Sequence, residues 1–254
     1  MTEKQIEAFF DVHNGLPREG PGSSQSTQIA YSCIPNKPDA PKILDVGCGP
    51  GAQTFCLAGL SAAEICAIDN HAPFIARLKQ SVADRHMEHR IHPTLADMTK
   101  LSFEDGTFDI IWAEGSIYIN GVENSLKQWR PFLKKAGSIA FTEISWLMDE
   151  VPPEPRQFWL DSYPEMSTIE GNVERIANCG FELTGYFILP ESDWWDEYYD
   201  PISKKLPALY EKYKDDAVAL KVLDMEAKEI DLYREYADYY GYVFYIAEKQ
   251  RGSV

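Results

Sequence analysis

The chain has 254 residues, 44% of them hydrophobic, so it can bury one substantial core and is near the upper size for a single α/β domain. Its formal net charge of -16 opposes attraction to phosphate backbones, so we expect no nucleic-acid partner. The opening residues lack a basic leader, and no segment approaches the roughly 20 apolar residues that cross a bilayer. We therefore expect a cytoplasmic protein without a membrane anchor.

Cysteine and histidine spacing gives no sign of a disulfide framework or a metal site. The five cysteines are scattered and never form a CxxC pair, which is typical of a reducing compartment. His86, His89 and His92 are three residues apart, but they span a predicted helix end and strand start. Because that boundary points them in different directions, we expect no shared metal ion.

The N-terminal region predicts a short helix followed by a loop. Ile6, Phe9 and Phe10 recur at helical spacing, and the next residues are rich in Gly, Pro and Ser. Residues 41–51, PKILDVGCGPG, then predict a buried strand that runs directly into a glycine-rich turn, followed by a helix.

Strand and helix patterns alternate from there to about residue 189. Further strands are predicted at 63–69, 90–97, 108–114, 137–145 and 181–189, with apolar helical stripes between most of them. Such alternation is typical of an α/β fold, a mostly parallel sheet with helices on both faces.

An insertion of about fifty residues precedes the last predicted strand, at 240–249. It begins with the aromatic and acidic run DWWDEYYDP and continues as two amphipathic helices. We therefore divide the chain into an N-terminal helix and loop cap (1–40), a core (41–190), a helical insertion or lid (191–239), and a final strand with a tail (240–254).

The glycine-rich turn is the strongest chemical signal. Gly47, Gly49 and Gly51 leave the backbone free to turn sharply and to approach a ligand, and the next helix offers its N-terminal amides. The same letters also fit the phosphate-binding turn of NAD enzymes. Asp45 argues against that alternative, because a carboxylate there would face the pyrophosphate, whereas a cationic ammonium would suit it.

Two more acids end the next two predicted strands. Asp69 is suited to bind ribose hydroxyls in either class of enzyme, and Asp97 can accept a hydrogen bond from an adenine amine. Three acids at successive strand ends fit an adenosine joined to an amino acid better than they fit a dinucleotide.

The motifs ILDVGCGPG, AIDN, ADM and FDIIWAEGSIYI, in this order, resemble those of class I S-adenosylmethionine-dependent methyltransferases from residue 41 to about 146. The N-terminal loop and the DWWDEYYDP run resemble a bacterial small-molecule type of this class. The resemblance implies a Rossmann-like sheet of seven strands in the order 3-2-1-4-5-7-6, with the site between strands one and four. It also implies S-adenosylmethionine as the cofactor and a small molecule as the methyl acceptor.

The resemblance assigns cofactor-binding roles by position along the sheet edge. Asp45 and the three glycines would hold the methionine part, with Gln53 nearby. Asp69 and Asn70 would bind the ribose, Asp97 and Met98 the adenine, and Glu114 with Gly115 would line the floor of the site.

Methyl transfer is an in-line displacement, so alignment matters more than acid or base chemistry, and a base is needed only for a protonated nucleophile. The candidates for that role are His13, Glu114, Tyr118 and Glu143. The substrate chamber is expected to include Tyr118, Glu143, Trp194, Trp195 and Tyr198. The aromatic run around Trp194 has two alternative uses, docking the inserted helices on the sheet or forming a homodimer contact.

Two rival functions remain open from the sequence. One is an NAD-dependent oxidoreductase, in which Asp45 and Asp97 have no role. The other is a non-catalytic sensor of S-adenosylmethionine that signals through the inserted helices. Aminopropyl transfer on the same fold is a minor variant, and the acceptor molecule and its accepting atom are not specified by these motifs.

Overall fold

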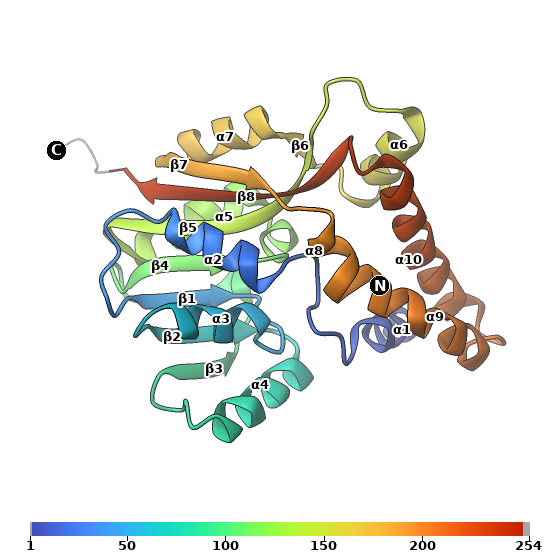
Figure 1. Cartoon of the computed structure of the whole chain (residues 1–254), viewed down its shortest axis with the longest axis horizontal. Helices are drawn as coiled ribbons and strands as arrows, with labels where there is room; N and C mark the ends of the chain where they lie inside the picture. The colour runs from blue at the N-terminus through green and yellow to red at the C-terminus, as the bar shows by residue number, and fades with distance from the viewer. Residues whose placement is uncertain (1, 251–254) are drawn as a thin grey trace.

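The computed structural model describes residues 2–250, which form a mixed sheet with helices on both faces (Figure 1). The strands lie in the order β3-β2-β1-β4-β5-β8-β7, and the two-residue strand β6 pairs with β5. β8 runs antiparallel to both of its neighbours, whereas the remaining strand pairs are parallel. The predicted α/β class and sheet order are thereby confirmed. Residues 251–254, the end of the predicted C-terminal tail, lie outside the described part of the chain.

The strands and helices have the following bounds. The strands are β1 (Lys42–Val46), β2 (Glu64–Asp69), β3 (Ile91–Leu95), β4 (Phe108–Ala113), β5 (Leu133–Trp146), β6 (Ser167–Thr168), β7 (Phe181–Ile188) and β8 (Tyr240–Lys249). The α-helices are α1 (Glu3–His13), α2 (Ser24–Ser32), α3 (Ala52–Leu60), α4 (Ala72–Asp84), α5 (Val122–Trp129), α6 (Pro153–Ser162), α7 (Ile169–Asn178), α8 (Ser192–Trp194), α9 (Asp200–Lys212) and α10 (Ala217–Tyr236). Short helical turns are η1 (Met98–Lys100), η2 (Ile117–Ile119), η3 (Arg130–Phe132) and the π-helical η4 (Trp195–Tyr199).

Two apolar layers hold helices against the two faces of the sheet. One layer packs Leu57 of α3 and Leu78 of α4 on β1 and β2, together with residues of α2. The other packs Leu126 of α5 and Ile176 of α7 on the opposite face. The central strands are buried on both sides, which explains why β1 and β4 are almost continuously apolar in sequence.

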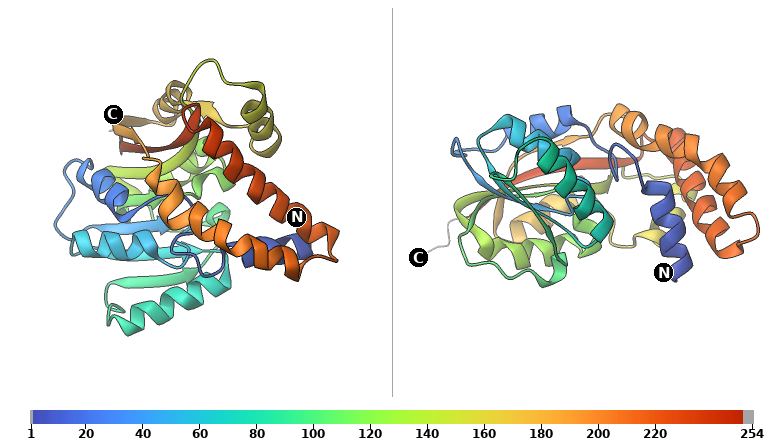
Figure 2. Two further views of the ribbon diagram at one scale, coloured as in Figure 1. Left: turned by 45° about the vertical axis from the view of Figure 1, so that its right-hand side comes forward. Right: turned by 90° about the horizontal axis from the view of Figure 1, so that it is seen from below.

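A third apolar cluster builds a helical cap at one end of the sheet. Val12 of α1, Tyr199 of η4, Leu223 of α10 and Tyr240 of β8 belong to this cluster. In Figures 1 and 2 the cap helices α1, α9 and α10 lie beyond the end toward which the parallel strands point. The cap therefore faces the carboxyl ends of β1, β2 and β4, where ligands bind in open α/β sheets.

Two helices occur where the sequence predicted only loop or bend. Helix α2 follows the Gly- and Pro-rich segment, and the Ser23 side chain caps it by accepting a hydrogen bond from the Ser26 amide at 3.1 Å. Helix α6 starts at Pro153, because a proline in the first turn has no amide that needs a partner. Pro152 and Pro153 thus mark the start of this helix.

Candidate functional site

The glycine-rich turn between β1 and α3 has the backbone shape that the sequence predicted. Gly47 and Gly51 have φ angles of 72° and 101°, in the left-handed region that favours glycine. A Cβ atom at Gly47 would lie 2.3 Å from the Cβ of Ser116, so no larger residue fits there without a shift. The turn therefore packs tightly against the segment after β4 and exposes its own backbone.

Asp69 at the end of β2 is tied to this turn. Its carboxylate accepts hydrogen bonds from the Gly49 amide at 3.0 Å and from the His71 amide at 2.7 Å. Burial raises the pKa of Asp69, and the two amide donors oppose that rise. The side chain is held rigidly at the edge of the sheet, which suits a carboxylate that accepts hydrogen bonds from sugar hydroxyls.

A cleft opens over the turn at the edge of the sheet. Its lower wall comes from the turn, from residues 68–71 after β2, and from residues 114–116 after β4. The cleft thus lies where β1 and β4 diverge, the predicted position between strands one and four.

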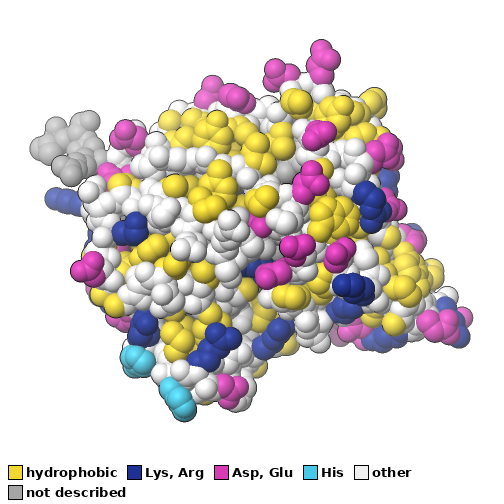
Figure 3. Space-filling model, in the orientation of Figure 1, with side chains coloured by type: hydrophobic (Ala, Val, Ile, Leu, Met, Phe, Trp, Pro, Cys, Tyr) yellow, Lys and Arg dark blue, Asp and Glu magenta, His cyan; other side chains and the backbone are white. Residues whose placement is uncertain are grey.

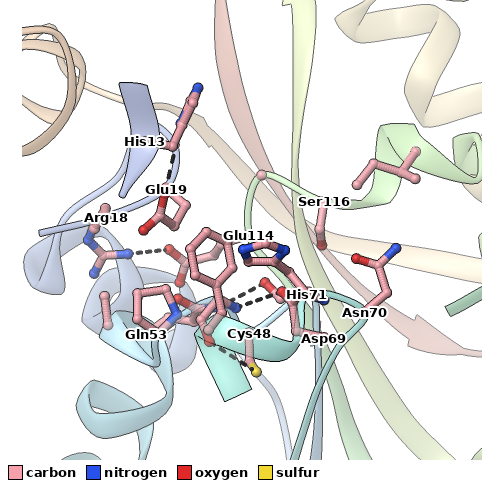
Figure 4. Close-up of a pocket in the computed structure, with 18 of the residues that line it drawn as sticks. His13, Arg18, Glu19, Cys48, Gln53, Asp69, Asn70, His71, Glu114 and Ser116 are labelled. Atoms are coloured by element: carbon pink, nitrogen blue, oxygen red, sulfur yellow. Dashed lines mark hydrogen bonds and ion pairs between the residues drawn. The ribbon is translucent and has the colours of Figure 1, made fainter. Parts of the chain in front are cut away.

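Residues 9–21 of the N-terminal segment cover the cleft, and we call this segment the roof. Phe10 stacks on His71 with ring centroids 3.5 Å apart, and His13 and Arg18 also line the cavity. Figure 4 shows the N-terminal segment crossing above the turn, with Arg18 pointing toward Glu114. The roof covers part of the cleft, which helps to exclude water from a reaction.

Glu114 is the most highly connected carboxylate of the cleft. It accepts hydrogen bonds from Arg18 Nη1 at 2.9 Å, from Thr27 Oγ1 at 2.7 Å and from Trp112 Nε1 at 2.8 Å. These contacts join β4 to α2 and to the N-terminal segment. Such saturation suits a residue that positions other groups better than one that abstracts a proton.

His13 lies between two carboxylates and is almost completely buried. Its Nδ1 is 3.8 Å from Glu19 Oε2, and its Nε2 is 3.5 Å from Glu226 Oε1 of α10. Neither oxygen of Glu19 has a hydrogen-bond partner among residues 2–250, and burial raises the pKa of Glu19 to about 8. The roof therefore brings a base and an unpaired acid to the cleft.

Most of the predicted cofactor-binding residues do line the cleft. They are Gly47, Gly49, Gln53, Asp69, Asn70, Met98, Glu114 and Gly115. His13 and Tyr118, two of the candidate bases, line it as well. The cleft is also lined by residues that no sequence motif marks, because they reach it only through contacts made in the folded chain. They are Phe9, Phe10, Glu19, His71 and Phe74.

Three predicted cofactor-binding residues lie outside the cleft lining. Asp45 is fully buried under the turn, where it accepts hydrogen bonds from Thr54 Oγ1 at 2.5 Å and Gln53 Nε2 at 3.2 Å. Gly51 caps α3 behind the turn. Asp97 is half-buried and caps η1 by accepting a hydrogen bond from the Thr99 amide at 2.9 Å. For these three residues the geometry favours a supporting role.

Some of the residues predicted to line the substrate chamber lie in the cleft and others lie outside it. Trp194 is 1% exposed and stacks on Tyr233 of α10 at 4.1 Å, so it belongs to the core of the cap. Trp195 and Tyr198 pack beside it in the same cluster. Glu143 is buried on β5 and is not part of the cleft wall. Of the predicted chamber, only Tyr118 reaches the cleft, and the alternative of helix docking describes Trp194 better.

Comparisons with known proteins agree with this geometry. Residues 43–137 match a family model described as a methyltransferase domain. The sterol 24-C-methyltransferase of Saccharomyces cerevisiae is 27% identical over 171 residues, which cover 63% of this chain and 44% of the yeast protein. The chain thus matches less than half the length of that relative.

Solved structures extend the likeness in fold to the whole chain. A methyltransferase from Geobacter sulfurreducens in complex with S-adenosyl-L-homocysteine superposes with a TM-score of 0.79 at 19% identity, covering 96% of this chain and 98% of that one. The [4+2]-cyclase SpnF superposes at 0.78 with 18% identity, covering 98% and 93%. Residues 43–137 therefore carry a methyltransferase domain, and the strand order and the glycine-rich turn agree with that match.

Proposed function

We propose that this protein transfers a methyl group from S-adenosylmethionine to a small-molecule acceptor. The observation that carries the proposal is the convergence of the glycine-rich turn, Asp69 and the N-terminal roof on one cleft at the carboxyl edge of the sheet. S-adenosylmethionine, when bound, supplies an electrophilic methyl group on a sulfonium.

The chain's own residues fit such a ligand in their chemistry. Asp69 offers a carboxylate to sugar hydroxyls, and Asn70 and Met98 flank the space on the adenosine side. Both carboxylate oxygens of Glu19 are buried, and neither has a hydrogen-bond partner among residues 2–250. They therefore suit a positively charged group of the ligand. A dinucleotide would instead bring pyrophosphate charge close to the Asp69 carboxylate, which disfavours the oxidoreductase alternative.

His13 is the proposed proton acceptor for an acceptor molecule that arrives protonated. It lines the cleft, and its Nε2 has no hydrogen-bond partner in the described part of the chain. Glu226, 3.5 Å from that nitrogen, stabilises the imidazolium that forms when His13 takes a proton. The roof that carries His13 also keeps water away from the reacting groups.

The relatives act on varied molecules, so the acceptor needs direct identification. They include a sterol 24-C-methyltransferase and a geranyl diphosphate C-methyltransferase, and one neighbour in fold is a [4+2]-cyclase. The test is therefore twofold: calorimetric titration with S-adenosylmethionine, S-adenosylhomocysteine and NAD, then transfer of a labelled methyl group to a metabolite extract. Binding of NAD alone overturns the proposal. Binding of S-adenosylmethionine without any labelled product favours the sensor.

A further inference from the structure

Arg18 is a buried arginine with one nitrogen left unpaired. Its side chain is 4% exposed, and it lines the cleft from the N-terminal roof. Nη1 donates to Glu114 Oε2 at 2.9 Å, and Nε donates to Glu197 Oε2 at 3.1 Å. Nη2 has no hydrogen-bond partner among residues 2–250.

An unpaired buried donor of this kind indicates a missing acceptor. A buried polar group without a partner destabilises the fold, and a charged group does so more strongly. Arg18 cannot relieve this cost by losing its proton, because guanidinium stays charged in proteins. Its Nη1 and Nε contacts hold the guanidinium plane in place, so Nη2 is presented in a fixed direction.

The location of Arg18 within the cleft limits what the acceptor can be. Figure 4 shows Arg18 and Gln53 on one side of the cleft and Asn70 on the opposite side. The ribose and adenine are expected on the Asp69 and Asn70 side, so the amino-acid end of the ligand extends toward Arg18. The anionic group at that end is a carboxylate, and guanidinium is the side chain best shaped to bind one.

We propose that Arg18 Nη2 binds the carboxylate of the methionine part of S-adenosylmethionine, an inference that rests on the proposed function. Neighbouring acids do not compete for Nη2, because Glu114 and Glu197 already accept from the other two nitrogens. Through Glu197 of η4 and Glu114 of β4, the same guanidinium joins the ligand, the cap and the core sheet. Cofactor recognition then depends on a residue outside the segment that carries the family motifs, since the family model matches residues 43–137.

Three nucleoside probes separate this role from a structural one. S-adenosylhomocysteine carries the carboxylate, whereas 5′-methylthioadenosine lacks the whole amino-acid end. Decarboxylated S-adenosylmethionine keeps the amine and the sulfonium and is compared with S-adenosylmethionine itself. Each dissociation constant is measured by calorimetric titration with the full chain, as wild type and as Arg18→Met and Arg18→Lys.

We expect Arg18→Met to weaken S-adenosylhomocysteine binding about 10- to 100-fold, the range for a lost hydrogen bond between charged groups. Binding of 5′-methylthioadenosine should stay at the wild-type value. Arg18→Lys should recover part of the loss, because it restores the charge without the fixed geometry. Arg85→Met is the matched control: it removes the same charge from a residue that does not line the cleft, and both affinities should stay unchanged.

Several results overturn the inference. An equal loss for both nucleosides shows that Arg18 only supports the fold of the roof, and no loss for either shows that the carboxylate binds elsewhere. Wild-type protein that binds none of the probes overturns the proposed function and this inference with it. If Arg18→Met fails to fold, the wild type alone decides: equal affinity for S-adenosylmethionine and its decarboxylated form contradicts a carboxylate contact.

Discussion

Three acidic residues lie at or near the carboxyl ends of β1, β2 and β3, and the fold gives each a different environment. Asp45 is enclosed beneath the glycine-rich turn, and burial raises its pKa to about 7. Asp69 lines the cleft, whereas Asp97 is half-buried outside it and its pKa falls to about 2 because Thr99 and Lys100 donate to it. Residues that are equivalent in the sequence pattern are therefore not equivalent in what they can contact.

This difference predicts unequal effects of neutralising Asp69 and Asp97. Asp69→Asn should weaken S-adenosylhomocysteine binding about 10- to 100-fold, because a charged acceptor at the wall of the cleft is lost. Asp97→Asn should leave the affinity close to that of the wild type, since its side chain caps η1 outside the cleft lining. Calorimetric titration of both variants measures this. A comparable loss in Asp97→Asn supports the adenine-binding role that the motif resemblance implied.

Glu143 provides a second test at the residue scale. Neither carboxylate oxygen finds a hydrogen-bond partner within residues 2–250, and burial raises the pKa of Glu143 to about 8. The folded state therefore holds this proton more tightly than the unfolded state, so stability falls as the pH rises from about 4.5 toward 8. Glu143→Gln should match the wild type at pH 5 and exceed it at pH 9 by about 1–3 kcal/mol, as measured by urea unfolding.

Glu182→Gln is the control for that experiment, because Glu182 is an exposed residue of β7. Its difference from the wild type should be the same at both pH values. Equal stability of Glu143→Gln and wild type at pH 9 shows instead that the Glu143 carboxyl ionises without penalty in the folded protein.

At the scale of elements, the sequence was most informative about the central sheet. The strands β1, β2 and β4 are largely apolar runs: β1 leads into Gly47, β2 ends at Asp69, and β4 is followed by Glu114 and Gly115. These local features indicate that the strands are parallel and that Asp69 lies at their carboxyl edge. The order of the strands in the sheet came from the resemblance to the methyltransferase class. Helices α2 and α6 escaped detection because a Ser or Pro near a helix start also signals a loop.

The candidate site was predictable only where it is built from consecutive residues. The turn and the strand ends carry a recognisable spacing, but the roof residues Phe10, Arg18 and Glu19 meet the turn through contacts that span tens of residues. The aromatic run after β7 was misleading for a related reason. Aromatic side chains suit both a ligand wall and a helix interface, and the distinction depends on which face of η4 packs against α10.

We therefore expect substitutions of the cap tryptophans to lower the free energy of unfolding without changing ligand affinity. Trp194→Ala should lower the free energy of unfolding by about 3–5 kcal/mol, because it opens a cavity where Trp194 stacks on Tyr233. Trp195→Ala should cost less, since Trp195 is only half-buried. Chemical denaturation measures both, and nucleoside affinity is then titrated well below the unfolding midpoint. An affinity lost in Trp194→Ala while the protein is still folded contradicts a purely structural role.

At the scale of the whole molecule, charge and architecture act separately. Figure 3 shows acidic side chains scattered over one face with Lys and Arg among them, not gathered into one patch. On this face the acidic charge is spread out, and the charges that bear on ligand binding are the few that line the cleft. Among residues 2–250 no helix is long and apolar enough to span a membrane.

The roof over the cleft makes ligand binding a link between distant parts of the chain. The roof is attached to the cap through Lys205 Nζ, which donates to the Val12 and Asn14 carbonyls, and through the Gly22 amide, which donates to the Asp193 carbonyl at 3.0 Å. Amides in such a segment exchange with solvent through local opening. A ligand lying beneath the roof must suppress those openings.

Hydrogen exchange should therefore report binding far from the glycine-rich turn. At a S-adenosylhomocysteine concentration about 100 times its dissociation constant, openings that expel the ligand become about 100-fold rarer. Amides of α1 and of residues 14–23 should then exchange more slowly, together with those of residues 47–53. Helix α7, on a sheet face away from the cleft, serves as the internal control and should show little change. Protection confined to residues 47–53 contradicts the roof, because it means that the ligand can leave without any movement of the N-terminal segment.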